Sequence, residues 1–459
     1  MHARVVNAWE NARASLWLLP ALLVVVACAL AIGLLGLDAR FPATTDARPW
    51  RFDGSASAAE TLLSTLAGSL ITVVSLAFSI TIVALQQAAT QLTPRVMRTF
   101  MHDRGNQLVF GSYIGTFTYA LLVLRRVRTP DAAGGGAFVP GLAIAAALVL
   151  AFWCVGLLIY FIHHIATSLQ VATVTDNIRR DLRHGIAHLY PQDLAEPVPG
   201  SGVAVALPRP GGPPTHTVRA ADAGFLRAVD EVQLLGALTP GARLARVRPQ
   251  VGDYVVTGAP LLEIWADRPG EVARADGALR AAFTLARERT SPQDLLFGVR
   301  QLVDIALRAR SPAINDPTTA EYCLAHLGDV VAQLAVRDFP AAVRRAPATG
   351  TLLLVAHPDF AAIVDAAFSQ IRRQARGDVH VTTALLTTLG WVAERARHPE
   401  RAAAIRRQID EVLAALGAQG FSAADEAAVR AGARAVCATL APRVEPERPC
   451  DATARGLSR

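Results

Sequence analysis

The sequence predicts an α-helical integral membrane protein with about four transmembrane helices, followed by a soluble α+β region. Of the 459 residues, 52% are hydrophobic and the mean hydropathy is +0.32, which is too apolar for a wholly soluble chain. Four uncharged apolar runs occur early in the chain, each close to the roughly 20 residues that a membrane-spanning helix needs. They cover residues 16–37, 62–85, 108–124 and 142–162. We therefore assign residues 1–170 to a transmembrane domain.

The first run follows a short N-terminal segment that carries Arg4 and Arg13. The apolar core of a secretory signal peptide is only about 7–15 residues long, and residues 16–37 form a longer run. This run is therefore expected to be an uncleaved transmembrane helix.

The second run and its flanks carry small and polar side chains at alternating steps of three and four residues. This spacing places them on one face of a helix. Two interpretations are open. Small, hydroxylic residues let transmembrane helices pack closely, or they line a path for water or ions in an oligomer or a bundle cavity. The stripe consists of Thr61, Thr65, Gly68, Thr72, Ser75, Ser79 and Gln86.

The four runs together give an even number of spans, so both ends of the chain are expected on one side of the membrane. Residues 86–107 carry Pro94 and several Arg and are typical of an interfacial segment. Basic residues are slightly more numerous on the N-terminal side, which favours cytoplasmic termini. The cluster of Arg125, Arg126 and Arg128 opposes this bias.

The soluble region is expected to contain three parts and a tail. These are a juxtamembrane helix with a Pro/Gly-rich linker (171–214), a small β-rich module (215–275), a mainly helical domain (276–441) and a disordered tail (442–459). Within the β-rich module, Phe225 to Leu238 is expected to be helical. Residues 350–356 are a candidate for a lone strand.

Helix starts in the mainly helical domain are marked by caps and prolines. Ser291 and Ser422 each precede an acidic residue by three positions, which is the spacing of a capping box. Pro317, Pro358 and Pro399 are expected at first helical positions, where the missing N–H costs nothing.

Residues 251–261 have the spacing GD-x-V-x-x-G-x-x-L, which resembles the hairpin of lipoyl-type barrel-sandwich modules. Those modules carry their cofactor on a Lys, whereas all 45 basic residues of this chain are Arg. The resemblance therefore implies a structural β-module only, and we predict no cofactor. The absence of Lys also excludes Schiff-base chemistry on a lysine.

Charge and cysteine content narrow the classes of partner. The net charge of +7 suits a protein that lies against anionic lipid headgroups, so the lipid bilayer is the first expected partner. No stretch interleaves Arg with aromatic residues, so no nucleic-acid partner is expected. None of the five Cys forms a CxxC pair, which argues against a disulfide framework or a zinc site.

We predict that the protein is not an enzyme, because the sequence contains no HExxH, GxSxG, GxGxxG or phosphate-loop motif. Asp181, His184 and His188 share a helix face and are weak candidates for metal ligands, although solvated side chains on a juxtamembrane helix explain them as well. We therefore assign no metal.

Two further groups are candidates for sensing or ligand binding. His163 and His164 end the fourth run, where an imidazole responds to pH or to lipid phosphate, or serves as an interfacial anchor. A polar loop before a helix start is a candidate ligand loop, or a tight turn held by caps. Its candidate residues are Asn315, Asp316, Thr318 and Thr319.

Three long stretches together resemble a known family. They are LAGSLITVVSLAFSITIVALQQAATQLTPRVMRTFMHDRGNQ (66–107), FIHHIATSLQ (161–170) and FGVRQLVDIALRARSPAINDPTTA (297–320). They are similar to the uncharacterised bacterial family of predicted membrane proteins catalogued as domain of unknown function 2254. The resemblance implies a bacterial inner-membrane protein with few N-terminal spans and a C-terminal soluble region. It implies no activity and no catalytic residues.

The leading hypothesis is a non-enzymatic membrane protein that associates with itself. Its second transmembrane helix packs at, or lines, a central passage like that of a channel, and its cytoplasmic region assembles or gates it. No charge lies within any run, which disfavours a pump. The alternative is a membrane-anchored scaffold or sensor whose soluble region binds a partner or a small ligand. The sequence does not identify a soluble partner.

Overall fold

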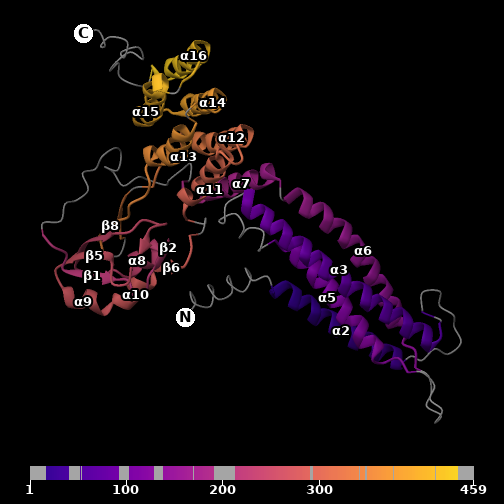
Figure 1. Ribbon diagram of the computed structural model, residues 1–459. Coiled ribbons are helices and arrows are strands. Elements are labelled where there is room, and N and C mark those ends of the chain that lie inside the picture. Colours follow the sequence, from indigo (N-terminus) through magenta and orange to yellow (C-terminus); the bar gives the residue numbers. More distant parts are fainter. Residues whose placement is uncertain are drawn as a thin grey trace, which may run out of the picture. The chain divides into compact units, whose positions relative to one another are not determined.

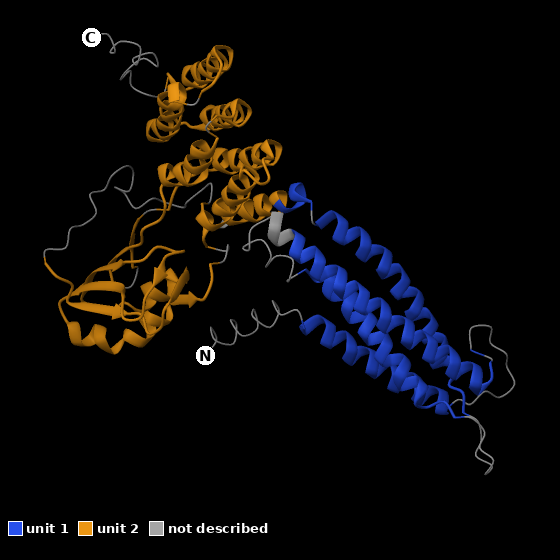
Figure 2. Ribbon diagram, in the orientation of Figure 1, with its two compact units in different colours: residues 1–174 blue, residues 175–459 orange. Residues whose placement is uncertain are grey.

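The computed structural model describes residues 17–40, 52, 54–91, 103–128, 138–168, 170–190, 212–289, 293–340, 342–346, 349–375, 377–418 and 420–442. Apart from Pro442, the predicted tail lies outside these residues, as does most of the predicted Pro/Gly-rich linker. The chain forms two compact units, residues 1–174 and 175–459, which Figure 2 shows in different colours.

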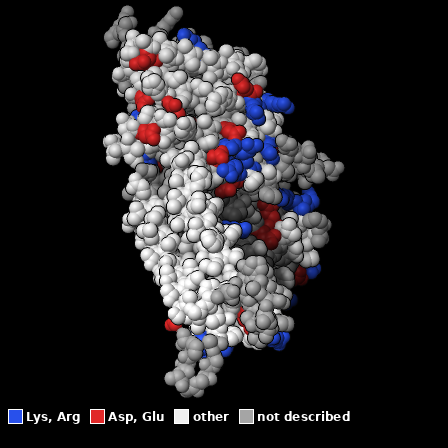
Figure 3. Space-filling view, turned by 90° about the vertical axis from the view of Figure 1, so that its right-hand side faces the viewer, with Lys and Arg blue, Asp and Glu red and all other residues white. Residues whose placement is uncertain are grey.

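The first unit is a bundle of four long helices, which confirms the predicted class (Figure 1). All four are long and apolar enough to span a membrane. On the face seen in Figure 3, a broad area over this unit shows no charged side chain. The helices are α2 (Leu18–Arg40), α3 (Ala56–Gln91), α5 (Arg104–Leu124) and α6 (Gly141–Ser168).

Helix α5 is the central helix of this bundle, because it makes the most extensive contacts with each of the other three. Gly111 and Gly115 form a G-x-x-x-G pair on α5 that faces α2. A Cβ atom built on Gly111 would lie 2.8 Å from Pro20 Cα, and one on Gly115 would lie 3.2 Å from Leu23 O. The two backbones therefore approach closely, as such pairs allow in membrane helices.

The end of α2 and the start of α6 are joined by Asp38, which is 3% exposed. Its carboxylate oxygens accept hydrogen bonds from Leu142 N at 3.2 Å and from Ala143 N at 2.9 Å. These N–H groups lie in the first turn of α6 and have no partner within the helix. Because this carboxylate is satisfied, α2 continues to Arg40, three residues beyond the predicted end of the first run.

The second unit contains two small antiparallel-rich sheets. A three-stranded sheet has the order β4-β2-β6, and a five-stranded sheet has the order β1-β5-β3-β8-β7. The strands are β1 (His216–Arg219), β2 (Gly224–Val229), β3 (Ala242–Val247), β4 (Tyr254–Val255), β5 (Pro260–Ala266), β6 (Phe283–Ala286), β7 (Val343–Arg345) and β8 (Leu352–Leu354). The two strands of the predicted hairpin, β4 and β5, belong to different sheets.

Two expectations about this region change. Phe225–Val229 is strand rather than helix, because it pairs with both β4 and β6; only α8 (Glu231–Ala237) is helical there. The predicted lone strand exists as β8, but it is not isolated. It pairs in parallel with β3, so Leu353 packs with the core of the β-rich module.

Helices make up the rest of the second unit. Several begin at the positions that the sequence predicted. Helix α12 starts at Pro317 after the cap Asp316, and α15 starts at Pro399. Ser422 Oγ accepts a hydrogen bond from Asp425 N and caps α16. Two starts differ. The cap of α11 is Asp294 rather than Ser291, and that of α13 is Asp359 rather than His357. The helices are α7 (Val171–Leu189), α9 (Pro269–Arg274), α10 (Asp276–Ala281), α11 (Leu295–Ala309), α12 (Pro317–Leu334), α13 (Phe360–Gln374), α14 (Val379–Arg395), α15 (Pro399–Ala415) and α16 (Ala423–Leu440).

Helix α7 is built into the second unit from Thr175 onward. Leu182 is buried, and a Cβ on Gly298 of α11 would lie only 2.5 Å from its side chain. Arg179 Nη1 lies 3.1 Å from Asp329 Oδ2 of α12, and Arg337 Nη1 donates to Tyr190 O at 2.6 Å. Because α6 ends at Ser168 and α7 begins at Val171, the fourth span continues almost directly into a core helix of the second unit.

Candidate functional site

The predicted stripe on α3 lies on the outer surface of the bundle. All seven of its residues, Thr61, Thr65, Gly68, Thr72, Ser75, Ser79 and Gln86, are exposed in the chain. The bundle is instead packed through another face of α3, which carries Ala59, Leu63, Ala67, Leu70 and Ala77. The stripe therefore takes no part in helix packing within the chain.

Several hydroxyl groups of the stripe donate to carbonyl oxygens of their own helix. Thr72 Oγ1 donates to Gly68 O at 2.8 Å, Ser75 Oγ to Ile71 O at 2.8 Å, and Ser79 Oγ to Ser75 O at 3.0 Å. Such bonds satisfy the donors without a second helix. The hydroxyl oxygens keep acceptor capacity on an outward-facing surface. A Cβ on Gly68 would meet nothing within 4 Å, so the chain leaves the space beside the stripe empty.

Within the bundle, close approach of two helix backbones occurs at Gly111 and Gly115 of α5. The G-x-x-x-G spacing in the third run is itself a signal for a packing face.

The two candidate histidines at the end of α6 have different environments. His163 is exposed, whereas His164 Nε2 lies 2.5 Å from Asp103 Oδ2 and its ring stacks on Tyr160 at 5.2 Å between centroids. Asp103 also caps α5, because its Oδ1 accepts from Gly105 N at 2.7 Å. His164 therefore ties the end of α6 to the start of α5, a role that the sequence did not predict for Asp103.

The candidate metal ligands on α7 are not brought together with further ligands. Asp181 and His184 are exposed, and the side chain of His188 lies outside the described part of the chain. Among the residues that the structure describes, no three His, Cys, Asp or Glu side chains form a group that could hold a metal ion.

The candidate ligand loop is held by internal contacts. Asp316 accepts from Thr319 N at 3.1 Å and from Thr319 Oγ1 at 2.6 Å, as expected of an N-cap. Asn315 has a positive φ of 46° and its Oδ1 accepts from Arg310 Nη1 at 2.7 Å. Thr318 is exposed. These contacts account for the polar residues of the loop as parts of a turn.

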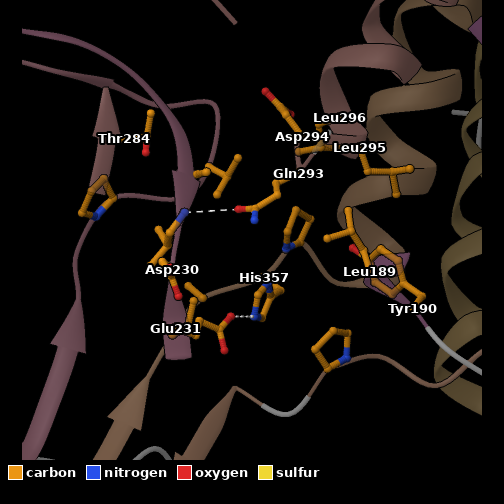
Figure 4. A pocket seen from close by; sticks show the side chains of 18 of the residues that line it. Leu189, Tyr190, Asp230, Glu231, Thr284, Gln293, Asp294, Leu295, Leu296 and His357 are labelled. Atoms are coloured by element: carbon orange, nitrogen blue, oxygen red, sulfur yellow. Dashed lines mark hydrogen bonds and ion pairs between the residues drawn. The ribbon is translucent and has the colours of Figure 1, made fainter. Parts of the chain in front are cut away.

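The second unit contains a cavity of about 510 Å³ that no pattern in the sequence indicated. It lies among the ends of β2 and α7, the starts of α8 and α11, and the segments around β7 and β8 (Figure 4). Leu189, Val251, Leu295 and Val355 contribute apolar walls. A volume of this size is within the range of small-molecule sites.

Three ionisable side chains meet at this cavity. Glu231 Oε2 lies 2.8 Å from Arg344 Nη1, and Glu231 Oε1 lies 3.7 Å from His357 Nε2 (Figure 4). The Arg344 contact lacks the alignment of a hydrogen bond. Glu231 Oε2 and His357 Nε2 are both buried, and neither has a hydrogen-bond partner among the described residues.

Burial shifts both titrations toward the neutral forms. It raises the pKa of the Glu231 carboxyl, and the positive charge of Arg344 opposes this only in part. It lowers the pKa of His357, and Arg344 lowers it further. The carboxylate of Glu231 is therefore poorly compensated by its protein surroundings.

Several other polar groups at or beside the cavity are engaged. Arg289 binds both oxygens of Asp294, at 2.8 and 2.9 Å, and Gln293 Oε1 accepts from Val229 N at 3.2 Å. Asp230 Oδ1 accepts from Gln233 N at 2.9 Å and caps α8. The one local signal near this site is the His357-Pro358 dipeptide, and it predicted a helix start rather than a binding residue.

The family comparison covers most of the chain. The model of the family DUF2254, described as "Predicted membrane protein", matches residues 13–390. The chain belongs to this family. The DUF2254 match includes all four helices of the bundle, both sheets and the cavity, and it ends within α14.

Two mycobacterial relatives extend the comparison of this DUF2254 protein. "Uncharacterized protein Rv1290c" of Mycobacterium tuberculosis (strain ATCC 25618 / H37Rv) and "Uncharacterized protein Mb1321c" of Mycobacterium bovis are each 35% identical over 388 residues. The matched part is 82% of this chain and 72% of each relative. No solved structure matches the chain.

Proposed function

We propose that this DUF2254 protein is a non-enzymatic homo-oligomer of the bacterial inner membrane in which the hydroxyl stripe of α3 packs at, or lines, a passage between subunits. The single observation that carries the proposal is the exposure of the whole stripe on the surface of the bundle. Its termini and second unit are then cytoplasmic, and the second unit assembles or gates the oligomer.

The chemistry of the stripe supports a neighbouring subunit. Glycine and short hydroxylic side chains offer lipid little contact area, but they let another helix approach closely. The hydroxyl donors of Thr72, Ser75 and Ser79 are already satisfied along α3, so burial against a second copy leaves these three O–H groups paired. The same surface, if it faces water at the centre of a ring, presents acceptor oxygens without charge.

The junction of α6 and α7 supports the gating part of the proposal. Only Leu169 and Gln170 separate the fourth helix of the bundle from α7, whose later residues belong to the core of the second unit. A rearrangement of the second unit that moves α7 would therefore pull on α6 through a short connection.

Assembly is tested by two matched glycine variants. Gly68 lies in the stripe and Gly156 lies on the exposed surface of α6, and a Cβ at either meets nothing within 4 Å. We expect wild type and Gly156→Leu to form one closed ring of three or more subunits in nanodiscs, by native mass spectrometry. Gly68→Leu is expected to shift the population to monomers. A monomeric wild type would overturn the proposal.

Conduction requires a separate measurement. Ser75→Leu narrows a passage lined by the stripe, so we expect lower single-channel conductance in reconstituted bilayers. Silence of the wild type across voltage, tension and pH, combined with an intact ring, would reject the passage and leave α3 as a subunit interface alone.

The second candidate function is a membrane-anchored scaffold or sensor whose soluble unit binds a partner or a small ligand. The cavity beside Glu231 and His357 favours it, because these groups are buried there without complete partners. In that case Ser75→Leu alters assembly, and ligand binding depends on the second unit.

A further inference from the structure

Among the described residues, the cavity of the second unit contains two buried acceptor atoms without a hydrogen-bond partner, Glu231 Oε2 and His357 Nε2. Glu231 Oε1 and His357 Nε2 are 3.7 Å apart, too far for a direct hydrogen bond. Figure 4 shows both side chains directed toward each other across the cavity wall. A buried acceptor without a hydrogen bond costs stability, and a donor placed between the Glu231 carboxylate and His357 Nε2 would reduce that cost.

The charges around the cavity favour a cation. Asp294 is neutralised by Arg289, with both carboxylate oxygens engaged. The remaining formal charges of the lining are negative at Asp230 and Glu231 and positive at Arg344. Because burial also keeps His357 neutral, its Nε2 is available as an acceptor when the other ring nitrogen carries the proton.

We propose that this cavity is the binding site for a small organic cation, with a primary ammonium group held by Glu231 and His357 and an apolar body against Leu189, Val251, Leu295 and Val355. The inference rests on the second candidate function, in which the soluble unit binds a small ligand. It does not depend on the assembly of α3.

Other ligand classes fit these residues less well. A metal ion lacks ligands, because no group of three suitable side chains exists among the described residues. An anion would meet one guanidinium, Arg344, that is already in contact with Glu231, and it would lie beside two carboxylates. An ammonium group supplies three N–H donors to a site in which His357 Nε2 has no hydrogen-bond partner and the Glu231 carboxylate has only the ion pair with Arg344.

A ligand in the cavity would contact the C-terminal end of α7, the helix that follows the membrane domain in the chain. Leu189 and Tyr190 at the end of α7 line the cavity, and Arg337 donates to the carbonyl of Tyr190. Ligand binding in the cavity would therefore change the contacts of α7, and α7 begins directly after α6 in the chain. This gives the proposed sensor a physical output.

The test compares three probes of similar size that differ in their head group: 2-phenylethylamine, 2-phenylethanol and 3-phenylpropionate. Binding to the full chain in nanodiscs of zwitterionic lipid is measured by isothermal titration calorimetry at pH 7.5. We expect the amine to bind at least tenfold more tightly than either other probe. Glu231→Gln is expected to weaken the amine at least tenfold, and His357→Leu at least threefold.

The control is Glu271→Gln on α9, which removes a partly exposed carboxylate that pairs with Arg268 outside the cavity. It should leave the affinity for the amine unchanged. Four results would each overturn the proposed site. These are equal binding of the three probes, tighter binding of 3-phenylpropionate, no binding of the amine, and an unchanged affinity for the amine in a folded Glu231→Gln variant. Native mass spectrometry of the same samples reports assembly separately, so loss of the α3 interface and loss of the cavity site are distinguishable.

Discussion

Among single residues, Asp38 makes the clearest prediction for the membrane unit. Asp38→Ala removes the acceptor of two first-turn N–H groups of α6 and leaves them buried. We expect the free energy of unfolding to fall by about 1–3 kcal/mol, as for other buried donors that lose a partner. Unfolding with SDS in mixed micelles measures this change. The matched control is Glu60→Ala, an exposed carboxylate on α3; an equal effect in both variants would contradict the role of Asp38.

His357 should make stability depend on pH. Its lowered pKa means that folding favours the neutral imidazole, so the folded chain binds fewer protons than the unfolded chain. This stabilisation is present above about pH 6.5, the ordinary value, and is lost as the pH falls through the lowered pKa. We expect His357→Gln to flatten the fall of melting temperature below pH 6.5. The exposed His398→Gln variant should retain the slope of the wild type.

Glu231 contributes a pH dependence of stability of the opposite sign, because burial raises the pKa of its carboxyl. Its stabilising contribution is present below its ordinary pKa of 4.5 and is lost as the pH rises through the raised value. Near neutral pH the folded state therefore carries a carboxylate that it stabilises incompletely. Residues that reduce stability in this way are common where a ligand completes the set of contacts.

The helix pair α2–α5 gives a prediction about packing between elements. Gly111→Leu places side-chain atoms where Leu23 Cδ1 and Pro20 Cα lie, 2.6 and 2.8 Å from the first added atom. We expect a loss of about 1–3 kcal/mol, since backbone atoms of α2 must move. Thermal unfolding in detergent measures the loss. Gly156→Leu adds the same side chain on an open surface of α6, and it should melt like the wild type.

Elements were predictable where their signal is local. The four spans follow from long uncharged runs, and the caps at Asp316 and Ser422 follow from side chains that bond within one turn. The face of each helix that packs was not predictable in the same way. On α3 the periodic hydroxyls mark one face correctly, but periodicity does not say whether that face meets a helix of the same chain.

Strands were harder to predict from the sequence, because their stability comes from partner strands that are distant in the sequence. Phe225–Val229 is a strand since it lies between β4 and β6, and neither partner can be deduced from its own pattern. The candidate cavity shows the same limit. Glu231, Arg344 and His357 come from three segments that the sheet pairing brings together, and their spacing in the sequence follows no period.

At the scale of the whole molecule, the boundary between the units lies inside α7 rather than in the Pro/Gly-rich segment. Ile178, Leu182 and Ile186 are buried in the second unit. We expect residues 171–442 to fold as a soluble fragment, whereas residues 212–442 lack α7 and expose the surface that it covers. Size-exclusion chromatography and circular dichroism of the two fragments test this. Equal solubility and equal cooperativity of thermal unfolding would contradict the role of α7.

The parallel pairing of β3 with β8 also has a consequence for biosynthesis. About 100 residues separate the two strands, which is roughly 5–20 s of translation at 5–20 residues per second. During that time β3 has β5 on one side and no partner on the other, so the nascent chain presents an open strand edge. The sheet closes only after α11 and α12 have left the ribosome. A slower ribosome, or a stop before Leu352, would therefore leave this edge available to chaperones and to other nascent chains.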